Sequence, residues 1–173
     1  GAAEASAIAF ANNQNSACCF RFLRDASDEG KRLMSLAEES PNIPGCFRID
    51  GQGAMLNRLV ESGEIYVQDE GSQMVAHSFG EIEGPFLDVC AAPGGKTGLI
   101  AKLHPETHVI AGDLHIKRVN YLAENCRRQG VLVEIVQYDA VKGLPFADMM
   151  FDAVLVDAPC SGTGTIRSNP ELR

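Results

Sequence analysis

The chain has 173 residues, of which 45% are hydrophobic and 22% are charged, and its mean hydropathy is -0.06. These values exclude a disordered chain and a fibrous repeat, and no apolar run approaches the roughly 18 residues that a membrane span requires. The formal net charge of -8 argues against a broad basic face for nucleic acid, although it leaves room for a local basic strip. The composition is that of a soluble globular protein.

The cysteines and the N-terminus indicate whether the protein binds a metal and in which cell compartment it is found. None of the cysteines has Cys-x-x-Cys spacing and the four histidines are scattered, which argues against zinc or another bound metal. Reduced thiols and a cytoplasmic location are expected, because most cysteines lie in apolar stretches and no signal peptide precedes them. The chain lacks an initiator Met, so we expect it to begin inside a longer gene product. The six cysteines are Cys18, Cys19, Cys46, Cys90, Cys126 and Cys160.

Residues 1–80 predict a small α+β unit. Short apolar runs predict strands over residues 16–22, 46–49 and 65–67. Three helical segments accompany them: Ser27 and Asp69 are candidate N-caps of the first and third, and Gly63 ends the second. The apolar residues expected on their buried faces are Leu33, Leu36, Ala37, Met55, Leu56, Leu59, Val60, Met74, Val75 and Phe79.

Residues 81–173 predict alternating strands and helices. Apolar runs indicate strands over residues 85–90, 109–111, 131–138 and 151–156. One helix begins at Thr97, and a second has Val119, Leu122, Ala123 and Cys126 on one face before Gly130 ends it. This alternation is typical of βαβ units, and hence of a parallel sheet in a doubly wound α/β fold.

A distinctive element follows each of these four strands. The loop over residues 91–96 follows the first, and Asp113, Asp139 and Asp157 follow the others. In an open α/β sheet, ligands bind at the carboxyl ends of the strands. A single Asp at the end of a strand caps the next turn about as often as it binds a ligand. Three in succession after a glycine loop favour a binding site.

The glycine loop admits a phosphate-binding interpretation and an S-adenosylmethionine-binding one. Gly95-Lys96-Thr97 resembles the end of a Walker A motif, with Asp157 as the matching magnesium ligand. However, Cys90 stands where that motif needs its first glycine, and Pro93 lacks a backbone N–H that a phosphate would use. Gly-x-Gly-x-x-Gly is absent, which also argues against a nicotinamide cofactor. A P-loop ATPase is therefore the less favoured alternative.

S-adenosylmethionine suits the same residues better. Glycines allow close approach of the methionyl part, and N–H groups at the helix start can hold its carboxylate. Asp113, 19 positions after Gly94, is placed to accept both ribose hydroxyls, and Asp139 can accept from the adenine amino group. A ring of carboxylates also complements the sulfonium cation.

The segment Asp157–Gly164 (Asp-Ala-Pro-Cys-Ser-Gly-Thr-Gly) suggests that a pyrimidine base accepts the methyl group. Carbon 5 of a pyrimidine becomes nucleophilic after a thiolate adds to carbon 6, and Cys160 beside the cofactor site would supply such a thiol. Asp157 is a candidate to hold the polar edge of the base. In isolation, a Pro-Cys pair is more often an inert thiol in a tight loop.

The segments Asp88–Thr97 and Asp157–Gly164 together resemble the Nop/Sun family of RNA cytosine-5 methyltransferases. The segments 166–167 (Ile-Arg), 169–170 (Asn-Pro) and 67–72 (Val-Gln-Asp-Glu-Gly-Ser) fit that family as well. Ala11-Asn12-Asn13 is more similar to its bacterial 16S ribosomal RNA branch, called Sun or Fmu. The resemblance covers roughly residues 10–173.

The resemblance implies a Rossmann-like S-adenosylmethionine-dependent methyltransferase sheet preceded by a small α+β unit that helps to bind RNA. Arg21, Arg24, Arg48, Arg167 and Arg173 are candidates for a local basic path, although each alone is more typical of a solvated surface residue. Lys96 is expected near the cofactor or the target base, and catalytic roles are expected for Cys160, Asp157 and Lys96. The residues expected at the cofactor are Cys90, Ala91, Ala92, Pro93, Gly94, Gly95, Lys96, Asp113, Arg118, Asp139 and Asp157.

One departure from the family concerns the nucleophile. In the family the covalent thiol lies in a later Thr-Cys-Ser motif, and the Pro-Cys cysteine, here Cys160, helps to release the product. Nothing follows Arg173, and only four of the family's seven strands are evident, so the chain is expected to be a fragment. The resemblance implies an S-adenosylmethionine-dependent RNA cytosine-5 methyltransferase that acts on ribosomal RNA, with transfer RNA as the other possible substrate. A non-catalytic RNA- or cofactor-binding module of the same fold is the alternative function.

Overall fold

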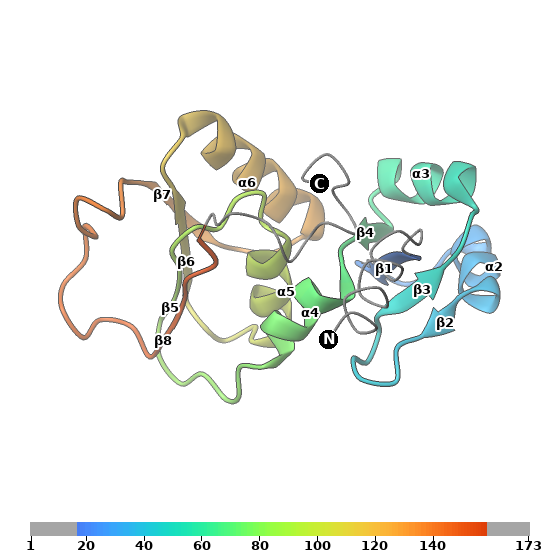
Figure 1. Ribbon diagram of the computed structural model, residues 1–173, viewed down its shortest axis with the longest axis horizontal. Coiled ribbons are helices and arrows are strands. Elements are labelled where there is room, and N and C mark those ends of the chain that lie inside the picture. The colour runs from blue at the N-terminus through green and yellow to red at the C-terminus, as the bar shows by residue number, and fades with distance from the viewer. Residues whose placement is uncertain (1–16, 159–173) are drawn as a thin grey trace, which may run out of the picture.

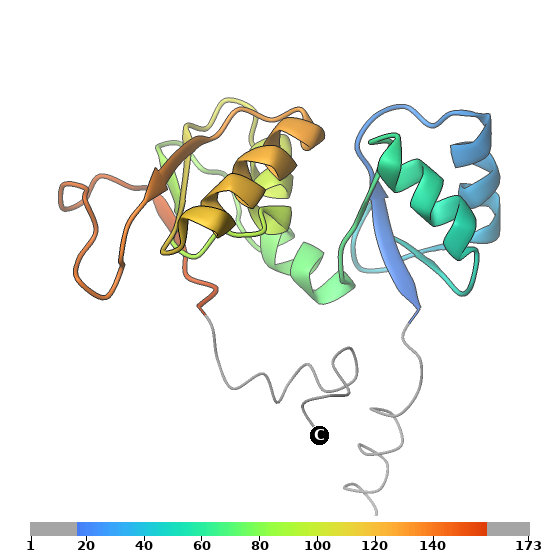
Figure 2. The ribbon, with the colours of Figure 1, turned by 90° about the horizontal axis from the view of Figure 1, so that it is seen from above.

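A computed structural model describes residues 17–158, which form two sheets connected through one helix (Figure 1). The first sheet is antiparallel and the second is parallel. Helices pack beside both sheets (Figure 2). No helix in the described part of the chain is long and apolar enough to cross a membrane.

The antiparallel sheet has the order β2-β3-β1-β4. Its core gathers Phe20, Leu33, Leu56, Leu59 and Ile65 between the sheet and two helices. Ser27 caps the first helix, as predicted, by accepting a hydrogen bond from the N–H of Gly30 at 3.1 Å. The elements are β1 (Cys18–Phe22), α2 (Asp28–Leu36), β2 (Glu38–Glu39), β3 (Phe47–Ile49), α3 (Gly53–Glu61) and β4 (Ile65–Val67).

The parallel sheet has the order β7-β6-β5-β8. Phe86 of β5 pairs with Val109 of β6 on one side and with Ala153 of β8 on the other. The order therefore reverses at β5, which makes the loop after β5 the expected ligand position. The elements are α4 (Glu70–His77), β5 (Phe86–Asp88), α5 (Gly95–Leu103), β6 (Val109–Asp113), α6 (Ile116–Gln129), β7 (Glu134–Gln137) and β8 (Ala153–Leu155).

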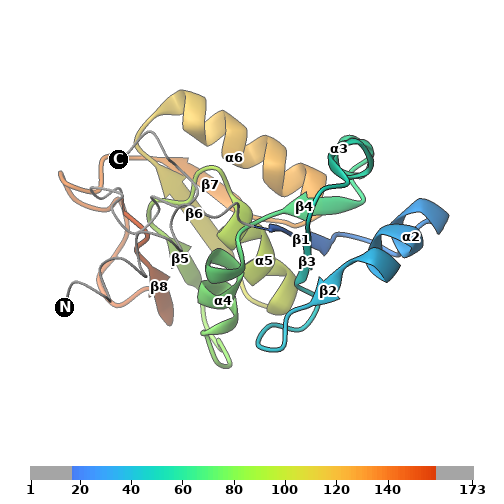
Figure 3. The same ribbon diagram turned by 45° about the vertical axis from the view of Figure 1, so that its right-hand side comes forward.

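The two faces of the parallel sheet are covered differently. Phe86 and Val109 pack with residues of α4 and α5, and Ala111 packs with Leu122 of α6. On the other face Leu87 and Ile110 pack with Tyr138, Phe146 and Phe151, which belong to the segment connecting β7 to β8. In the part of the chain that the structure describes, helices thus cover one face and an aromatic loop covers the other (Figure 3).

Several local expectations need correction. The strand β2 was not predicted, because a two-residue strand of glutamates carries no apolar signal. Helix α5 begins at Gly95, two residues before the predicted start. Of the residues expected inside, Leu36 is 52% exposed, Met74 is 48% exposed and Ala123 is also exposed, because tertiary packing selects a narrower helix face than spacing suggests. The apolar run over residues 151–156 is typical of a central strand covered on both faces, but Val154 of β8 is 45% exposed.

Candidate functional site

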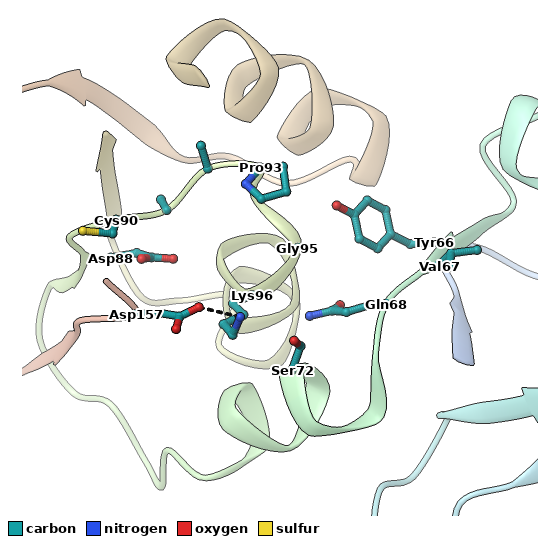
Figure 4. Close-up of a pocket in the computed structure, with 12 residues that line it drawn as sticks. Tyr66, Val67, Gln68, Ser72, Asp88, Cys90, Pro93, Gly95, Lys96 and Asp157 are labelled. Atoms are coloured by element: carbon teal, nitrogen blue, oxygen red, sulfur yellow. Dashed lines mark ion pairs between the residues drawn. The ribbon is translucent and has the colours of Figure 1, made fainter. Parts of the chain in front are cut away.

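Two adjoining cavities lie at the carboxyl ends of the parallel strands. The larger, about 460 Å³, is bounded by residues at or just after the ends of β6, β7 and β8, including Asp113, Tyr138 and Asp139. The smaller, about 180 Å³, lies between the loop after β5 and the segment after β4. Cys90 lines both. The smaller cavity is lined by Tyr66, Val67, Gln68, Ser72, Asp88, Cys90, Ala91, Ala92, Pro93, Gly95, Lys96 and Asp157 (Figure 4).

Helix α6 holds the glycine loop in place. Gly94 has φ of +100° and is the N-cap of α5, a conformation that favours glycine. Its carbonyl accepts a hydrogen bond from Gln129 Nε2 at 3.1 Å, and the carbonyl of Pro93 accepts one from Asn125 Nδ2 at 2.7 Å. Two α6 side chains thus fix the loop. The first N–H groups of α5 have no intrahelical acceptors because they lie in the first turn of the helix.

Asp113 ends β6 with its side chain only 6% exposed. The Nε of Arg118 lies 3.1 Å from Asp113 Oδ2, and Arg118 Nη2 donates to the carbonyl of Ala92 at 2.9 Å. Arg118 therefore links the acidic strand end to the glycine loop. Both residues line the larger cavity.

Asp139 also lines the larger cavity, but its carboxylate is engaged nearby. Oδ1 accepts from the N–H of Val141 at 3.1 Å, and Oδ2 lies 3.4 Å from Lys142 Nζ. The preceding Tyr138 is buried and its hydroxyl donates to the carbonyl of Val89 at 3.2 Å. The ring passes so close to Gly112 that a Cβ there would overlap it.

Two residues that line the smaller cavity form an ion pair. Lys96 Nζ and Asp157 Oδ2 are 2.7 Å apart, bringing together two residues that are 61 positions apart in sequence (Figure 4). Lys96 belongs to α5 and Asp157 follows β8. The Asp157 side chain is 55% exposed, so it remains accessible to a ligand.

Asp88 is a candidate that the sequence reasoning passed over. Its side chain is buried at the end of β5, where Oδ2 accepts from Thr97 Oγ1 at 2.7 Å and Oδ1 has no partner among residues 17–158. Burial raises the pKa of this carboxyl to about 6, and the hydrogen bond from Thr97 only partly opposes the shift. Its position at the end of a predicted strand, just before the glycine loop, could have identified it as a site residue from the sequence.

Arg21 joins the antiparallel sheet to the glycine loop. This buried side chain donates from Nε to Gln68 Oε1 at 3.2 Å and from Nη2 to the carbonyl of Gly95 at 3.4 Å, and it also bonds Gln129 Oε1. Its guanidinium lies 5.1 Å from the ring centroid of Tyr66. Burial lowers the pKa of Arg21 to about 10.

The expected basic path therefore needs correction at Arg21, which is 4% exposed and faces the interior. Arg48 is partly exposed and lies 3.7 Å from Glu70. Arg24 is exposed and donates to the carbonyl of Ser62. Arg167, Arg173 and the expected catalytic Cys160 lie outside the described residues.

The described thiols are free. Burial raises the pKa of the Cys90 thiol and the carboxylate of Asp113 raises it further, so Cys90 is a poor source of thiolate. Burial also raises the pKa of Cys46 and of Cys126 to about 11. Within residues 17–158 no three His, Cys, Asp or Glu side chains cluster as metal ligands.

A parallel sheet with a glycine loop at its switch point and an acid ending the next strand defines the Rossmann-like fold of the methyltransferases. A methyltransferase homologue from Pyrococcus horikoshii shares this fold with a TM-score of 0.74 and 29% identity, over 92% of this chain and 55% of that chain. A family profile described as 16S rRNA methyltransferase RsmB/F matches residues 80–173. The chain belongs to this family.

Curated relatives carry related names. Ribosomal RNA small subunit methyltransferase B of Enterobacter sp. (strain 638) is 35% identical over 96% of this chain and 41% of its own length. The probable ribosomal RNA small subunit methyltransferase B of Bacillus subtilis (strain 168) is 39% identical over 65% of this chain and 26% of its own length. The chain therefore spans less than half the length of these relatives.

Proposed function

We propose that the complete protein transfers a methyl group from S-adenosylmethionine to carbon 5 of a cytosine in 16S ribosomal RNA. The observation that carries this proposal is the pair of adjoining cavities at the switch point of a chain in the RsmB/F family. Their shared wall at Cys90 allows two ligands to meet. A ribosomal RNA substrate is consistent with a cytoplasmic protein.

The larger cavity suits the methyl donor. Its volume of about 460 Å³ lies in the range of small-molecule sites, and apolar residues such as Val141 and Val156 can sandwich a purine. Asp113 would accept from the ribose hydroxyls and Asp139 from the adenine amino group. Arg118 positions Asp113, and Cys90, Ala91, Ala92, Pro93, Gly94 and Gly95 would border the methionyl part.

Buried polar groups near the loop fit the methionyl end. The first N–H groups of α5, including that of Lys96, can hold a carboxylate at the positive end of the helix. Asp88 presents a buried oxygen that lacks a partner among the described residues, as an ammonium group would need. When bound, the donor supplies an electrophilic methyl on a sulfonium.

The smaller cavity suits the target base. Asp157 and Lys96 offer a carboxylate and an ammonium group 2.7 Å from each other. The carboxylate can accept from the amino group of a cytosine, and the ammonium group can donate to its ring acceptors. The base must leave its stack to enter such a cavity. We assign Cys160, three residues after Asp157, to release of the product, and the nucleophile to a later Thr-Cys-Ser motif of the complete protein.

In this scheme the residues 1–80 form an RNA-binding unit ahead of the catalytic unit over residues 81–173. Helix α4 lies at the joint between the two, because Ala76 packs with Phe86 and Leu99 of the parallel-sheet unit. Arg24 is the described arginine of the expected basic path that remains exposed. Transfer RNA is the alternative substrate.

Calorimetric titration with S-adenosylmethionine tests the donor site. We expect micromolar binding, lost in Asp113→Ala because the ribose acceptor disappears, and retained in Asp148→Ala, which removes an exposed carboxylate elsewhere. Methyl transfer to 16S rRNA, followed by nucleoside analysis for 5-methylcytosine, tests the reaction. Binding of ATP with magnesium and no response to the methyl donor would refute the proposal and favour a P-loop ATPase. Donor and RNA binding without transfer by the complete protein would favour the non-catalytic module.

A further inference from the structure

Gln68 places a buried amide at the wall of the smaller cavity. This residue follows β4, outside the parallel-sheet unit, and is 8% exposed. Its Nε2 has no hydrogen-bond partner among residues 17–158. Figure 4 shows the side chain pointing into the cavity from the side opposite Asp88, toward Lys96.

The orientation of this amide is determined by its neighbour. Arg21 carries only donors, so the group that faces its Nε at 3.2 Å is necessarily the carbonyl oxygen of Gln68. The amide N–H₂ must then face the cavity. A buried donor left without a partner lowers stability unless a ligand satisfies it.

We propose that Gln68 is a specificity-determining residue that donates from Nε2 to a ring acceptor of the target pyrimidine. The N-terminal unit thereby supplies part of the base site itself, in addition to any grip on the RNA backbone. This inference rests on the proposed function, which puts the target base in the smaller cavity.

Two features favour the base over the methyl donor as the partner of Gln68. The cavity of about 180 Å³ is smaller than typical sites for whole cofactors, and is suited to a single ring. Asp157 lies on the same cavity and precedes Cys160 by three residues, and we assign both of these residues to the base.

Polar groups of the smaller cavity complement cytosine. Gln68 Nε2 is a donor without a partner within the described residues, and Asp157 presents an accessible carboxylate to the same cavity. The polar edge of cytosine presents an amino group beside ring acceptors, whereas uracil presents a carbonyl oxygen in place of the amino group. A donor for the ring and a carboxylate for the amino group therefore select cytosine.

Gln129 provides a matched structural comparison. It is buried and is bonded through its Oε1 to the same Arg21, but its Nε2 donates to the carbonyls of Gly94 and Asn125, both at 3.1 Å. Gln129→Glu therefore removes two protein hydrogen bonds. Gln68→Glu removes none that the described residues make, and keeps the oxygen that accepts from Arg21.

The test measures methyl transfer by the complete protein to 16S rRNA with radiolabelled S-adenosylmethionine. For Gln68→Glu we expect kcat/KM for RNA to fall roughly 10- to 100-fold, because an acceptor replaces the donor that faces the base. The KM for S-adenosylmethionine should stay within about twofold and the Tm should be unchanged, since no protein hydrogen bond is lost. Gln129→Glu should lower the Tm, and Gln52→Glu, at an exposed site of the N-terminal unit, should leave both kinetics and Tm unchanged.

Gln68→Met keeps the side-chain length without charge and is the second variant, should the buried carboxylate of Gln68→Glu prevent folding. It loses the oxygen that accepts from Arg21 Nε, so a modest fall in its Tm is expected. Its kcat/KM for RNA should fall in the same direction. Normal RNA kinetics in either folded variant would overturn the inference while leaving the proposed function intact, as would a selective loss of affinity for the methyl donor. Absence of cytosine-5 transfer by the unchanged protein would overturn the proposed function and this inference together.

Discussion

Neutralising Asp88 should stabilise the protein at neutral pH. The carboxyl is buried beside the glycine loop, and its pKa is raised from 3.8 to about 6. Below pH 4 the acid is protonated in both folded and unfolded chains. Between pH 4 and 6 the unfolded chain releases the proton while the folded chain keeps it, so stability falls as the pH rises.

The magnitude follows from the size of the shift. A rise of about two pKa units corresponds to about 3 kcal/mol of unfolding free energy, lost in full above pH 6. Asp88→Asn removes the ionisation and retains an oxygen that can accept from Thr97 Oγ1. Its stability relative to the unchanged protein should rise by up to about 3 kcal/mol between pH 4 and 8, or roughly 6–12 °C in Tm.

Urea unfolding followed by circular dichroism at pH 4, 5, 6, 7 and 8 measures this difference. Asp25→Asn, at an exposed turn, is the control for the loss of one carboxylate. A difference that is constant over this range, or that shrinks as the pH rises, would refute the assignment of a buried carboxyl with a raised pKa. We expect the same variant to bind S-adenosylmethionine more weakly, because the amide of Asn carries no charge for the ammonium group.

Two further predictions concern the joint between the units. Arg21→Met should lower the unfolding free energy by about 3 kcal/mol, because the oxygens of Gln68, Gln129 and Gly95 lose their donor, and Arg24→Met, at an exposed site, should have little effect in the same urea titration. Gly95→Ala should cost about 1 kcal/mol and reduce methyl transfer to RNA more than donor binding, since its Cβ would lie 3.2 Å from Tyr66 Cε1 and 3.4 Å from Gln68 Cδ. Unchanged RNA kinetics in Gly95→Ala would contradict the role we give to this contact.

Much of the local structure was predictable because it depends on nearby residues. Ile65–Val67 forms the predicted strand, and Asp69 caps the next helix by accepting from the N–H of Gly71 at 2.8 Å. The ends of β6 and β8 bring Asp113 and Asp157 to the same edge of the sheet, as the strand pattern indicated. Such features follow from periodicity and capping, which act within a few residues.

The long-range contacts were not predictable. The sequence places Arg21 in a run of apolar and aromatic residues, with nothing to show that it bonds to Gln129, 108 positions away. The burial of Asp88, and hence its raised pKa, depends on the packing of α5 against β5. The contribution of Gln68 to the smaller cavity likewise depends on how two sheets meet, which no local pattern encodes.

The glycines of the loop illustrate what the motif specifies. From the sequence we expected them to admit a cofactor, but a Cβ at Gly94 would lie 2.9 Å from Leu122 Cδ1, and one at Gly95 would press on Tyr66 and Gln68. A Cβ at Gly98 would overlap the Gln129 side chain. The small residues thus allow α6 and the N-terminal unit to approach the loop from two directions. Tyr66 and Gln68 therefore connect the N-terminal unit directly to the loop backbone that we propose binds the methyl donor.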